Sequence, residues 1–328
     1  MENKTLLEIK NLKTYFHVGK SIVKAVDGVS FNLNKGETTA IVGESGSGKS
    51  ITSLSIMQLL PTNVIDENNG IINFDGKNLL TLSEKEMRKI RGNRISMIFQ
   101  EPMTSLNPVY NLSYQISEAI ILHQNKNKSQ ARQLAIEMLD LVGIPEPNKR
   151  IDSYPHELSG GMRQRAMIAM ALCCKPEILI ADEPTTALDV TIQAQILELM
   201  KSLQKKLNMS ILFITHDLGV VSEVADKVMV MYLGHIVEMA DADELFSNPK
   251  HPYTRALLQV APTISIGPKK RKNILKGEIP SPINPPSGCV FRTRCPHPTH
   301  DCKEGNIEMG LIEVSPGHWV DQCCVHCG

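Results

Sequence analysis

One short loop limits what this chain can fold into more than any other feature. Residues 43–50 read Gly-Glu-Ser-Gly-Ser-Gly-Lys-Ser and fit the spacing G-x-x-x-x-G-K-[S/T]. The apolar run at residues 38–42 predicts a buried strand before the loop, and residues 51–60 predict a helix that ends near Pro61. A glycine-rich loop between a strand and a helix is the context that a phosphate-binding loop needs.

Each residue type in this loop suits the phosphates of a nucleotide. Glycines let backbone N–H groups close round a phosphate, and the start of a helix adds positive potential. We expect Lys49 to reach the β- and γ-phosphates and the Ser50 hydroxyl to ligate Mg²⁺. A plain glycine-rich turn is the alternative, but it needs no Lys-Ser pair after a strand. The residues predicted to bind ATP here are Gly43, Glu44, Ser45, Gly46, Ser47, Gly48, Lys49 and Ser50.

Charge and hydropathy argue against two broad classes of protein. The chain has 328 residues, enough for two or three lobes, and its formal net charge is 0, which does not favour a nucleic-acid partner. Its longest uninterrupted apolar run is the nine residues 166–174, far short of a membrane span. The N-terminus lacks a signal-peptide pattern, so we expect a cytosolic start and a peripheral place in any membrane process.

Polar residues follow the ends of predicted strands elsewhere in the chain. Three such strands end in Gln100, in Asp182 and Glu183, and in His216. Because parallel strands deliver their carboxyl ends to one edge of a sheet, these side chains are candidates for Mg²⁺ and γ-phosphate contacts. An Asp-Glu turn after a core strand, and a structural histidine, are the plain alternatives.

The stretch between the first two of these strand ends is predicted to be mostly helical. Its clearest apolar face, which Gly143 ends, consists of Ala131, Leu134, Ala135, Met138, Leu139 and Val142. Beyond it, Ser159 and two glycines precede a helix predicted at residues 165–174, which offers a second helix start suited to an anion.

These segments together, in their order and spacing, closely resemble the ATP-binding subunit of an ABC transporter over about residues 5–245. The resemblance implies ATP hydrolysis, with Ser50, Gln100 and Asp182 at the Mg²⁺. It implies that Glu183 is the general base, that His216 is the switch histidine and that Asp189 lies in the D-loop. The signature loop, which would contact the ATP of a partner subunit, falls on Leu158, Ser159, Gly160, Gly161 and Met162.

The match to the family departs from the usual pattern at one position and is ambiguous at another. Met162 stands where the family's signature usually has glutamine, but Ser159 and the glycines carry the phosphate contacts, so we do not expect a loss of function. The aromatic residue that stacks on adenine falls best on Phe16, with Tyr15 as the alternate, although both are also ordinary strand residues.

Three further segments look like the branch of ABC transporters that imports di- and oligopeptides. They are residues 100–108, residues 251–258 and residues 277–289. This resemblance implies a second, different ATPase subunit, two transmembrane permease subunits and, indirectly, an extracytoplasmic peptide-binding protein, with this chain peripheral on the cytoplasmic side of the membrane. Nickel importers share much of the pattern, and an ABC ATPase without a transporter, or an export ATPase, are further alternatives.

The 8 cysteines are unevenly distributed, because two are adjacent at positions 173–174 and the other six fall within residues 289–327. In a reducing compartment such a cluster favours metal binding over disulfides. The likeness to peptide-importer ATPases implies the ligands Cys289, Cys295, Cys302 and Cys323, with Cys324 as an alternate for the last.

Four thiolates without Cys-x-x-Cys pairs suit a [4Fe–4S] cluster better than a zinc ribbon. Zinc, with His297 or His300 as an additional ligand, is the alternative. We expect a structural role for this cluster, because the nucleotide chemistry needs no electron transfer. The basic run at residues 269–272 is expected to be a solvated face.

The predicted fold class is α/β, with a P-loop NTPase core of the ABC type, an antiparallel β flank, an inserted helical subdomain and a C-terminal metal-binding extension. The expected boundaries are residues 1–100 and 166–248 for the core, 101–165 for the helical subdomain and 249–328 for the extension.

Overall fold

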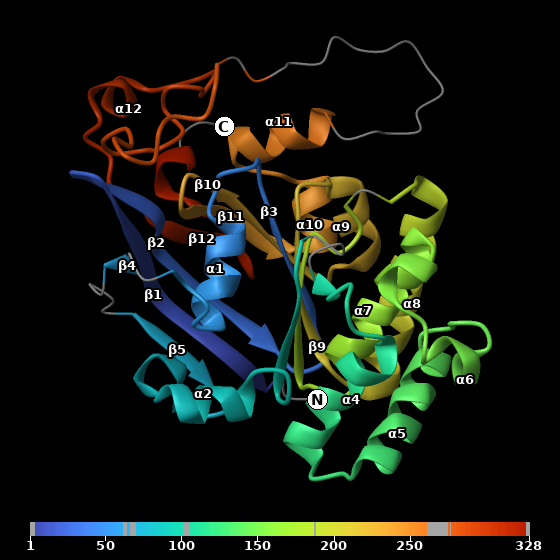
Figure 1. The fold of residues 1–328 in the computed structure, drawn as a ribbon. Coiled ribbons are helices and arrows are strands. Elements are labelled where there is room, and N and C mark those ends of the chain that lie inside the picture. The colour runs from blue at the N-terminus through green and yellow to red at the C-terminus, as the bar shows by residue number, and fades with distance from the viewer. Residues whose placement is uncertain are drawn as a thin grey trace, which may run out of the picture. The chain divides into compact units, whose positions relative to one another are not determined.

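The computed structural model describes residues 4–61, 64–65, 70–100, 105–186, 188–260, 275 and 277–325 (Figure 1). The chain divides into two compact units. The first consists mainly of Thr81–Phe213, and the second of Thr5–Leu33, Glu37–Leu80 and Ile214–Gly328. None of the helices in the described ranges is both long enough and apolar enough to cross a membrane.

An antiparallel sheet in the second unit confirms the predicted strands near the N-terminus. Its order is β2-β1-β5-β6, with β4 paired to β1. Residues 5–34 form two long strands, which turn at Gly19, where φ is 62°. A hairpin turn at Asp75 and Gly76 connects β5 and β6, with both residues at positive φ. The strands are β1 (Thr5–Val18), β2 (Ser21–Asn34), β4 (Val64–Ile65), β5 (Ile71–Phe74) and β6 (Lys77–Asn78).

A second run of strands in this unit carries the strand that leads into the P-loop. Its order is β12-β13-β11-β10-β3, in which β3 and β10 are parallel and the other neighbours are antiparallel. All five residues of β3 are buried, as predicted for a central strand. The strands are β3 (Thr38–Val42), β10 (Lys227–Tyr232), β11 (His235–Asp241), β12 (Leu311–Ser315) and β13 (His318–Asp321).

The helices of the second unit are mostly short. The helix after the P-loop, α1, ends at Ile56 and not near Pro61 as predicted. Gln58 adopts a left-handed conformation, and the N–H of Leu59 donates to the carbonyl of Leu54, so a Schellman-type turn ends the helix early. These helices are α1 (Lys49–Ile56), α9 (Leu218–Val224), α10 (Ala242–Ser247), α11 (Pro252–Val260) and α12 (His300–Glu304).

In the first unit, buried strands occur together with most of the long helices. β7 (Ile95–Ile98) and β8 (Ile178–Asp182) are parallel neighbours. β9 (Ser210–Thr215) lies next to β8 and contains the boundary between the units. The three strands were all predicted at these places, within a residue or two at each end.

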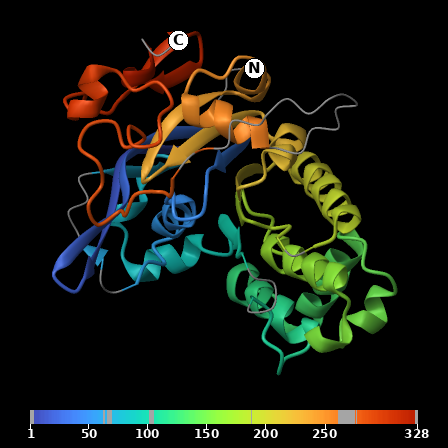
Figure 2. The same cartoon turned by 90° about the horizontal axis from the view of Figure 1, so that it is seen from above.

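The helices of the first unit confirm the helical stretch predicted before the signature loop. α4, α5 and α7 pack against one another, in green to yellow-green in Figures 1 and 2. The predicted apolar face of α5 is buried or half-buried, and Gly143 follows with φ of 75°. α7 begins at Gly160, five residues earlier than predicted. The helices are α2 (Glu84–Ile90), α4 (Leu112–Gln124), α5 (Lys128–Leu141), α6 (Pro147–Arg150), α7 (Gly160–Leu172) and α8 (Val190–Leu207).

A buried charge cluster attaches β13 to the rest of the second unit. The side chains of Glu238 in β11 and His318 in β13 are both fully buried, and His318 Nε2 lies 2.8 Å from Glu238 Oε1. The carboxylate of Glu238 also accepts the backbone N–H groups of Lys250, at 2.6 Å, and His251, at 3.0 Å. Every oxygen of this buried carboxylate therefore has a donor, as burial of a charge requires.

Candidate nucleotide and thiol sites

The P-loop lies in the second unit between β3 and α1. Its close packing explains two of its glycines, since a Cβ atom at Gly43 would lie 2.2 Å from the carbonyl oxygen of Met231, and one at Gly48 would lie 2.3 Å from that of Ala25. Gly48 also has φ of 105°, which L side chains rarely adopt. The N–H of Gly234 donates to the carbonyl of Ser47 at 2.8 Å and so holds the loop against the end of β10.

Lys49 is the first residue of α1, and its side chain turns back over the loop. Its ammonium donates to the carbonyls of Gly43, at 2.8 Å, and Glu44, at 3.0 Å, and the residue is 5% exposed. Ser47 Oγ is buried and has no hydrogen-bond partner among the described residues. A helix start, an ammonium group and an unsatisfied hydroxyl fit the phosphates of ATP, with Ser50 in the first helical turn as the candidate Mg²⁺ ligand.

The acidic strand end lies in the first unit. Asp182 is the last residue of β8 and is 4% exposed, and Glu183 follows it with a left-handed backbone, φ 48°. Glu183 Oε2 accepts Gln100 Nε2 at 3.0 Å and Thr186 Oγ1 at 2.9 Å. The structure therefore brings the predicted Q-loop glutamine and the predicted base into contact. A strained backbone held by two side-chain donors is typical of a functional position.

The signature residues occupy the start of α7 in the same unit. Ser159 caps this helix, because its Oγ accepts the N–H of Met162 at 3.3 Å. Ser159 and Gly160 are exposed, whereas Leu158 is buried. The fully buried Gln164 donates from Nε2 to the carbonyl of Pro184, which follows Glu183 and so links α7 to the acidic strand end.

Two further predicted residues lie at helix starts. Asp189 caps α8, and its carboxylate accepts the N–H of Ile192 at 2.9 Å. His216 follows β9 in the second unit and is exposed, while its neighbour Asp217 caps α9 by accepting the N–H of Gly219 at 2.8 Å. Both capping contacts are structural, and the D-loop and switch roles stay predictions.

The candidate adenine-stacking residues are buried in β1. Phe16 is 9% exposed and Tyr15 is 8% exposed. The hydroxyl of Tyr15 donates to Asp27 at 2.5 Å, and Lys24 Nζ lies 5.4 Å from the centre of its ring. Neither ring presents an open face in this structure, and the adenine contact stays a prediction.

The described cysteines of the C-terminal extension are free thiols, and most are buried. Cys289 Sγ lies 3.3 Å from Cys323 Sγ, which in turn lies 3.4 Å from Cys324 Sγ. Burial raises the pKa of the Cys295 thiol, and the nearby thiols of Cys289 and Cys302 raise it further. The predicted ligands thus gather in one part of the second unit, with Cys323 next to Cys289, and a set of soft thiol donors fits an iron–sulfur cluster or zinc.

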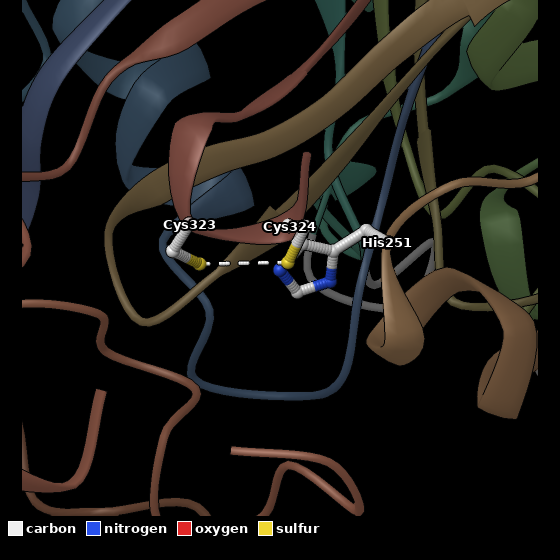
Figure 3. Close-up of side chains that lie close together, drawn as sticks. All are labelled: His251, Cys323 and Cys324. Carbon is white, nitrogen blue, oxygen red and sulfur yellow. Dashed lines mark hydrogen bonds between the residues drawn. The ribbon is translucent and has the colours of Figure 1, made fainter. Parts of the chain in front are cut away.

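One histidine near these thiols was not among the predicted ligands. The donor atoms of His251, Cys323 and Cys324 all lie within 4.8 Å of one another, and Figure 3 shows the ring beside both sulfurs. His251 is fully buried, its Nδ1 accepts the N–H of Tyr253, and burial lowers its pKa to about 3, so the ring is neutral. The predicted alternative ligands His297 and His300 are exposed. Only their position close to the cysteines in the sequence had suggested His297 and His300 as ligands. His251 is remote from the cysteines in the sequence, so no such pattern pointed to it.

Sequence reasoning also missed contacts between the extension and the P-loop. The hydroxyl of Tyr253 accepts the N–H of Glu44 at 2.9 Å, and Arg294 donates to the Glu44 carboxylate at 2.7 and 3.2 Å. These hydrogen bonds to Glu44 raise the pKa of Arg294. Tyr253 lies in a segment that already resembled peptide importers, but no local pattern indicated its partner.

Some predicted features lie outside the described residues. They are the first half of the importer-like segment after Gln100, the residue two positions before Asp189, the basic run and the last cysteine, at positions 101–104, 187, 269–272 and 327.

The chain matches two protein-family models. Residues 26–186 match the model described as "ABC transporter", and residues 237–302 match the one described as "Oligopeptide/dipeptide transporter, C-terminal region". The second match covers the segment that contains His251, Tyr253, Arg294 and three of the clustered cysteines.

Similar proteins include relatives that match over nearly their whole length. The "Oligopeptide transport ATP-binding protein AppD" of Bacillus subtilis (strain 168) is 57% identical over 298 residues, which cover 91% of this chain and 90% of that protein. The "Dipeptide transport ATP-binding protein DppD" of Escherichia coli (strain K12) is 51% identical over 309 residues, 94% of this chain and 93% of that protein. Among solved structures, the dimeric ATP-binding cassette MJ0796, in a post-hydrolysis state bound to ADP and Pi, is 28% identical, with a TM-score of 0.64 over 72% of this chain and 98% of that chain.

Proposed function

Since this chain belongs to the family of ABC transporter ATP-binding proteins, we propose that it is the ATP-hydrolysing subunit of a di- or oligopeptide importer. The observation that carries the substrate class is the match of residues 237–302 to the oligopeptide/dipeptide transporter C-terminal region. This region includes Tyr253 and Arg294, which contact the P-loop residue Glu44, so the likeness covers more than the ATPase core.

The P-loop residues bind and orient the phosphates in this proposal. Backbone N–H groups of Gly43–Ser50 and the Lys49 ammonium hold the β- and γ-phosphates. Mg²⁺, held by Ser50, Gln100 and Asp182, would neutralise charge that develops on the phosphates during transfer. Phe16, or Tyr15 in its place, would stack on the adenine after turning outwards.

Glu183 acts as the general base that orients the attacking water and accepts its proton. Gln100 and Thr186 hold its carboxylate, which supports this role. His216 would contact the γ-phosphate side of the site as the switch histidine. The loop Leu158–Met162 and Asp189 would serve the ATP of the partner subunit, with Ser159 and the two glycines at its phosphates.

The proposed assembly pairs this chain with a second, different ATPase subunit and with two permease subunits in the membrane. An extracytoplasmic peptide-binding protein would deliver the substrate, and this chain would be peripheral on the cytoplasmic side. Within the chain, we propose a core of residues 1–100 and 166–248, a helical subdomain of 101–165 and an extension of 249–328. The packing of α4, α5 and α7 supports the helical subdomain.

Purification and uptake measurements test this function. Tagged chain should co-purify from membranes with a second ATPase and two permeases, and deletion of its gene should reduce di- and oligopeptide uptake to background while nickel uptake is unchanged. Loss of nickel uptake alone would favour a nickel importer. A fully active homodimer that binds no membrane subunit would contradict the proposed assembly.

We further propose that Cys289, Cys295, Cys302 and Cys323 hold a [4Fe–4S] cluster. Three of these four thiols are buried, which supports the ligand set, and the 3.3 Å contact of Cys323 with Cys289 favours Cys323 over Cys324 as the fourth ligand. The cluster would cross-link a segment that has few apolar residues of its own. Zinc, with His251 as a possible nitrogen ligand beside Cys323 and Cys324, is the alternative.

Metal analysis of the parent protein distinguishes the iron–sulfur cluster from zinc, and the Cys295→Ser variant tests one of the ligands. Protein purified without oxygen should be brown, with about four iron and four sulfide per chain. Cys295→Ser should lose the colour and most of the iron because one thiolate ligand is missing, whereas Cys174→Ser, outside the extension, should keep both. Colourless anaerobic protein with about one zinc per chain would overturn the cluster.

A further inference from the structure

Glu44 of the P-loop is held by two side chains that lie more than 200 residues further along the chain. Arg294 donates both arms of its guanidinium to the carboxylate, Nη1 to Oε2 at 2.7 Å and Nη2 to Oε1 at 3.2 Å. The Tyr253 hydroxyl accepts the backbone N–H of the same residue at 2.9 Å. A bidentate arginine fixes the orientation as well as the position of a carboxylate.

This contact is more buried than an ordinary surface ion pair. The side chain of Arg294 is 5% exposed and that of Glu44 is 33% exposed. The guanidinium carbon of Arg294 lies 5.8 Å from the ring centre of Tyr232, and the rings of Tyr232 and Tyr253 both pack on Phe291. Aromatic packing thus fixes both groups that hold Glu44, which lowers the entropy cost that makes exposed pairs weak.

Glu44 is connected in turn to the P-loop lysine. Its carbonyl accepts Lys49 Nζ at 3.0 Å, while its N–H is the donor to Tyr253. A displacement of Glu44 would therefore move a backbone group that positions the ammonium expected to meet the phosphates. Because hydrogen bonds to phosphate depend on sub-ångström placement of donors, such a displacement would weaken nucleotide binding.

The turn that presents Arg294 also carries two of the clustered thiols. The carbonyl of Phe291 accepts the N–H groups of Arg294, at 2.9 Å, and Cys295, at 3.0 Å, and the carbonyl of Cys289 accepts that of Arg292 at 3.1 Å. Arg294 thus lies between Cys289 and Cys295 in one hydrogen-bonded turn. Any ligand that binds these two thiols fixes the backbone that directs Arg294 toward Glu44.

We infer that Arg294 and Tyr253 are positioning residues of the nucleotide site, and that the occupancy of the neighbouring thiols controls ATP affinity through Glu44. This inference rests on the proposed function of the P-loop and on the proposed metal at the thiols. In it the extension regulates the ATPase: metal-loaded thiols hold Glu44 in its binding position, and empty thiols release it.

Binding of a non-hydrolysable ATP analogue, measured by calorimetry on the full chain, tests the first part. Arg294→Ala should raise the dissociation constant about 3- to 10-fold, because a charge-assisted pair with one partly exposed partner is lost. Arg132→Ala removes a comparable bidentate pair with Asp152 in the first unit and should leave the constant unchanged. In turnover, KM should rise for Arg294→Ala with little change in kcat.

A double-mutant cycle separates positioning from general destabilisation. Glu44→Gln and Arg294→Ala should weaken binding to a similar degree, and the double variant no more than either alone, because both changes break one interaction. Tyr253→Phe removes only the acceptor for the Glu44 N–H and should weaken binding less. Additive effects, or losses of affinity that follow the melting temperature across all variants, would show that the contact is structural only.

Removal of the metal tests the second part. Oxidation with ferricyanide and chelation with EDTA, followed by removal of both reagents and return of Mg²⁺, should weaken analogue binding by the wild type and should have no further effect on Arg294→Ala. Unchanged affinity of the wild type after metal removal would overturn the control by thiols. Failure of the untreated wild type to bind the analogue would instead contradict the proposed function, so the two failures are distinguishable.

Discussion

Glu183→Gln is expected to reduce ATP turnover by about 10²- to 10³-fold while ATP still binds, as loss of a general base predicts. Glutamine keeps the size of the side chain and can keep an oxygen toward Gln100 and Thr186, which hold Glu183 at 3.0 and 2.9 Å. It cannot accept a proton from the attacking water. ATP binding should therefore be retained. The closed, ATP-bound dimer with the partner ATPase should accumulate, because the hydrolysis that reopens it does not occur.

Phosphate release measures the loss of turnover, and binding of an ATP analogue measures the retained affinity. Glu177→Gln is a matched control, because Glu177 lies at the opposite end of β8 and pairs with Arg94 at 2.5 Å. This control should turn over ATP at the parental rate. Parental turnover by Glu183→Gln would mean that another group activates the water.

Lys49→Ala is expected to weaken ATP binding itself, by about 10- to 100-fold, the range for loss of a hydrogen-bonding charged group. In this structure the Lys49 ammonium donates to carbonyls of the loop itself, those of Gly43 at 2.8 Å and Glu44 at 3.0 Å. It can exchange these for phosphate oxygens at little cost. Alanine leaves both the carbonyls and the phosphates without this cation.

Calorimetry with ATP and Mg²⁺ checks this result, with the melting temperature as a measure of folding. Lys10→Ala removes an exposed lysine that pairs with Glu8 in β1, and it should bind ATP as the parent does. If Lys49→Ala folds normally and binds ATP with parental affinity, the P-loop is not the nucleotide site.

Local patterns predicted the nucleotide-binding elements well. The strand, glycine loop and helix start around Lys49 and the buried run that ends in Asp182 depend on residues that are close in sequence. The early end of α1 was less predictable, because Gln58 takes a left-handed conformation that usually belongs to glycine. Likewise, the glycines beside Ser159 are helical here, so α7 begins before the first strong helix former.

Contacts between distant segments could not be predicted in this way. Arg294 and Glu44 are 250 positions apart, and no periodicity or spacing connects them. The cysteine cluster of the tail was expected to have a structural role, but nothing in the sequence indicated that an arginine of the tail bonds a P-loop residue directly. His251 meets Cys324 only because β13 returns to the edge of β11, and that pairing depends on the whole unit.

Because of the buried Glu238, the segment that matches the family model is not the same as the segment that folds as one cooperative unit. The match to the C-terminal region begins at residue 237, inside β11, and ends at residue 302, before β13. Yet the carboxylate of Glu238 is paired with His318 and accepts backbone N–H groups of Lys250 and His251. A chain cut after β11 would strand a carboxylate in the protein interior, at a cost of about 3–5 kcal/mol for a broken buried pair. In evolution, the ATPase core and its extension could therefore not be exchanged separately without a compensating change at Glu238.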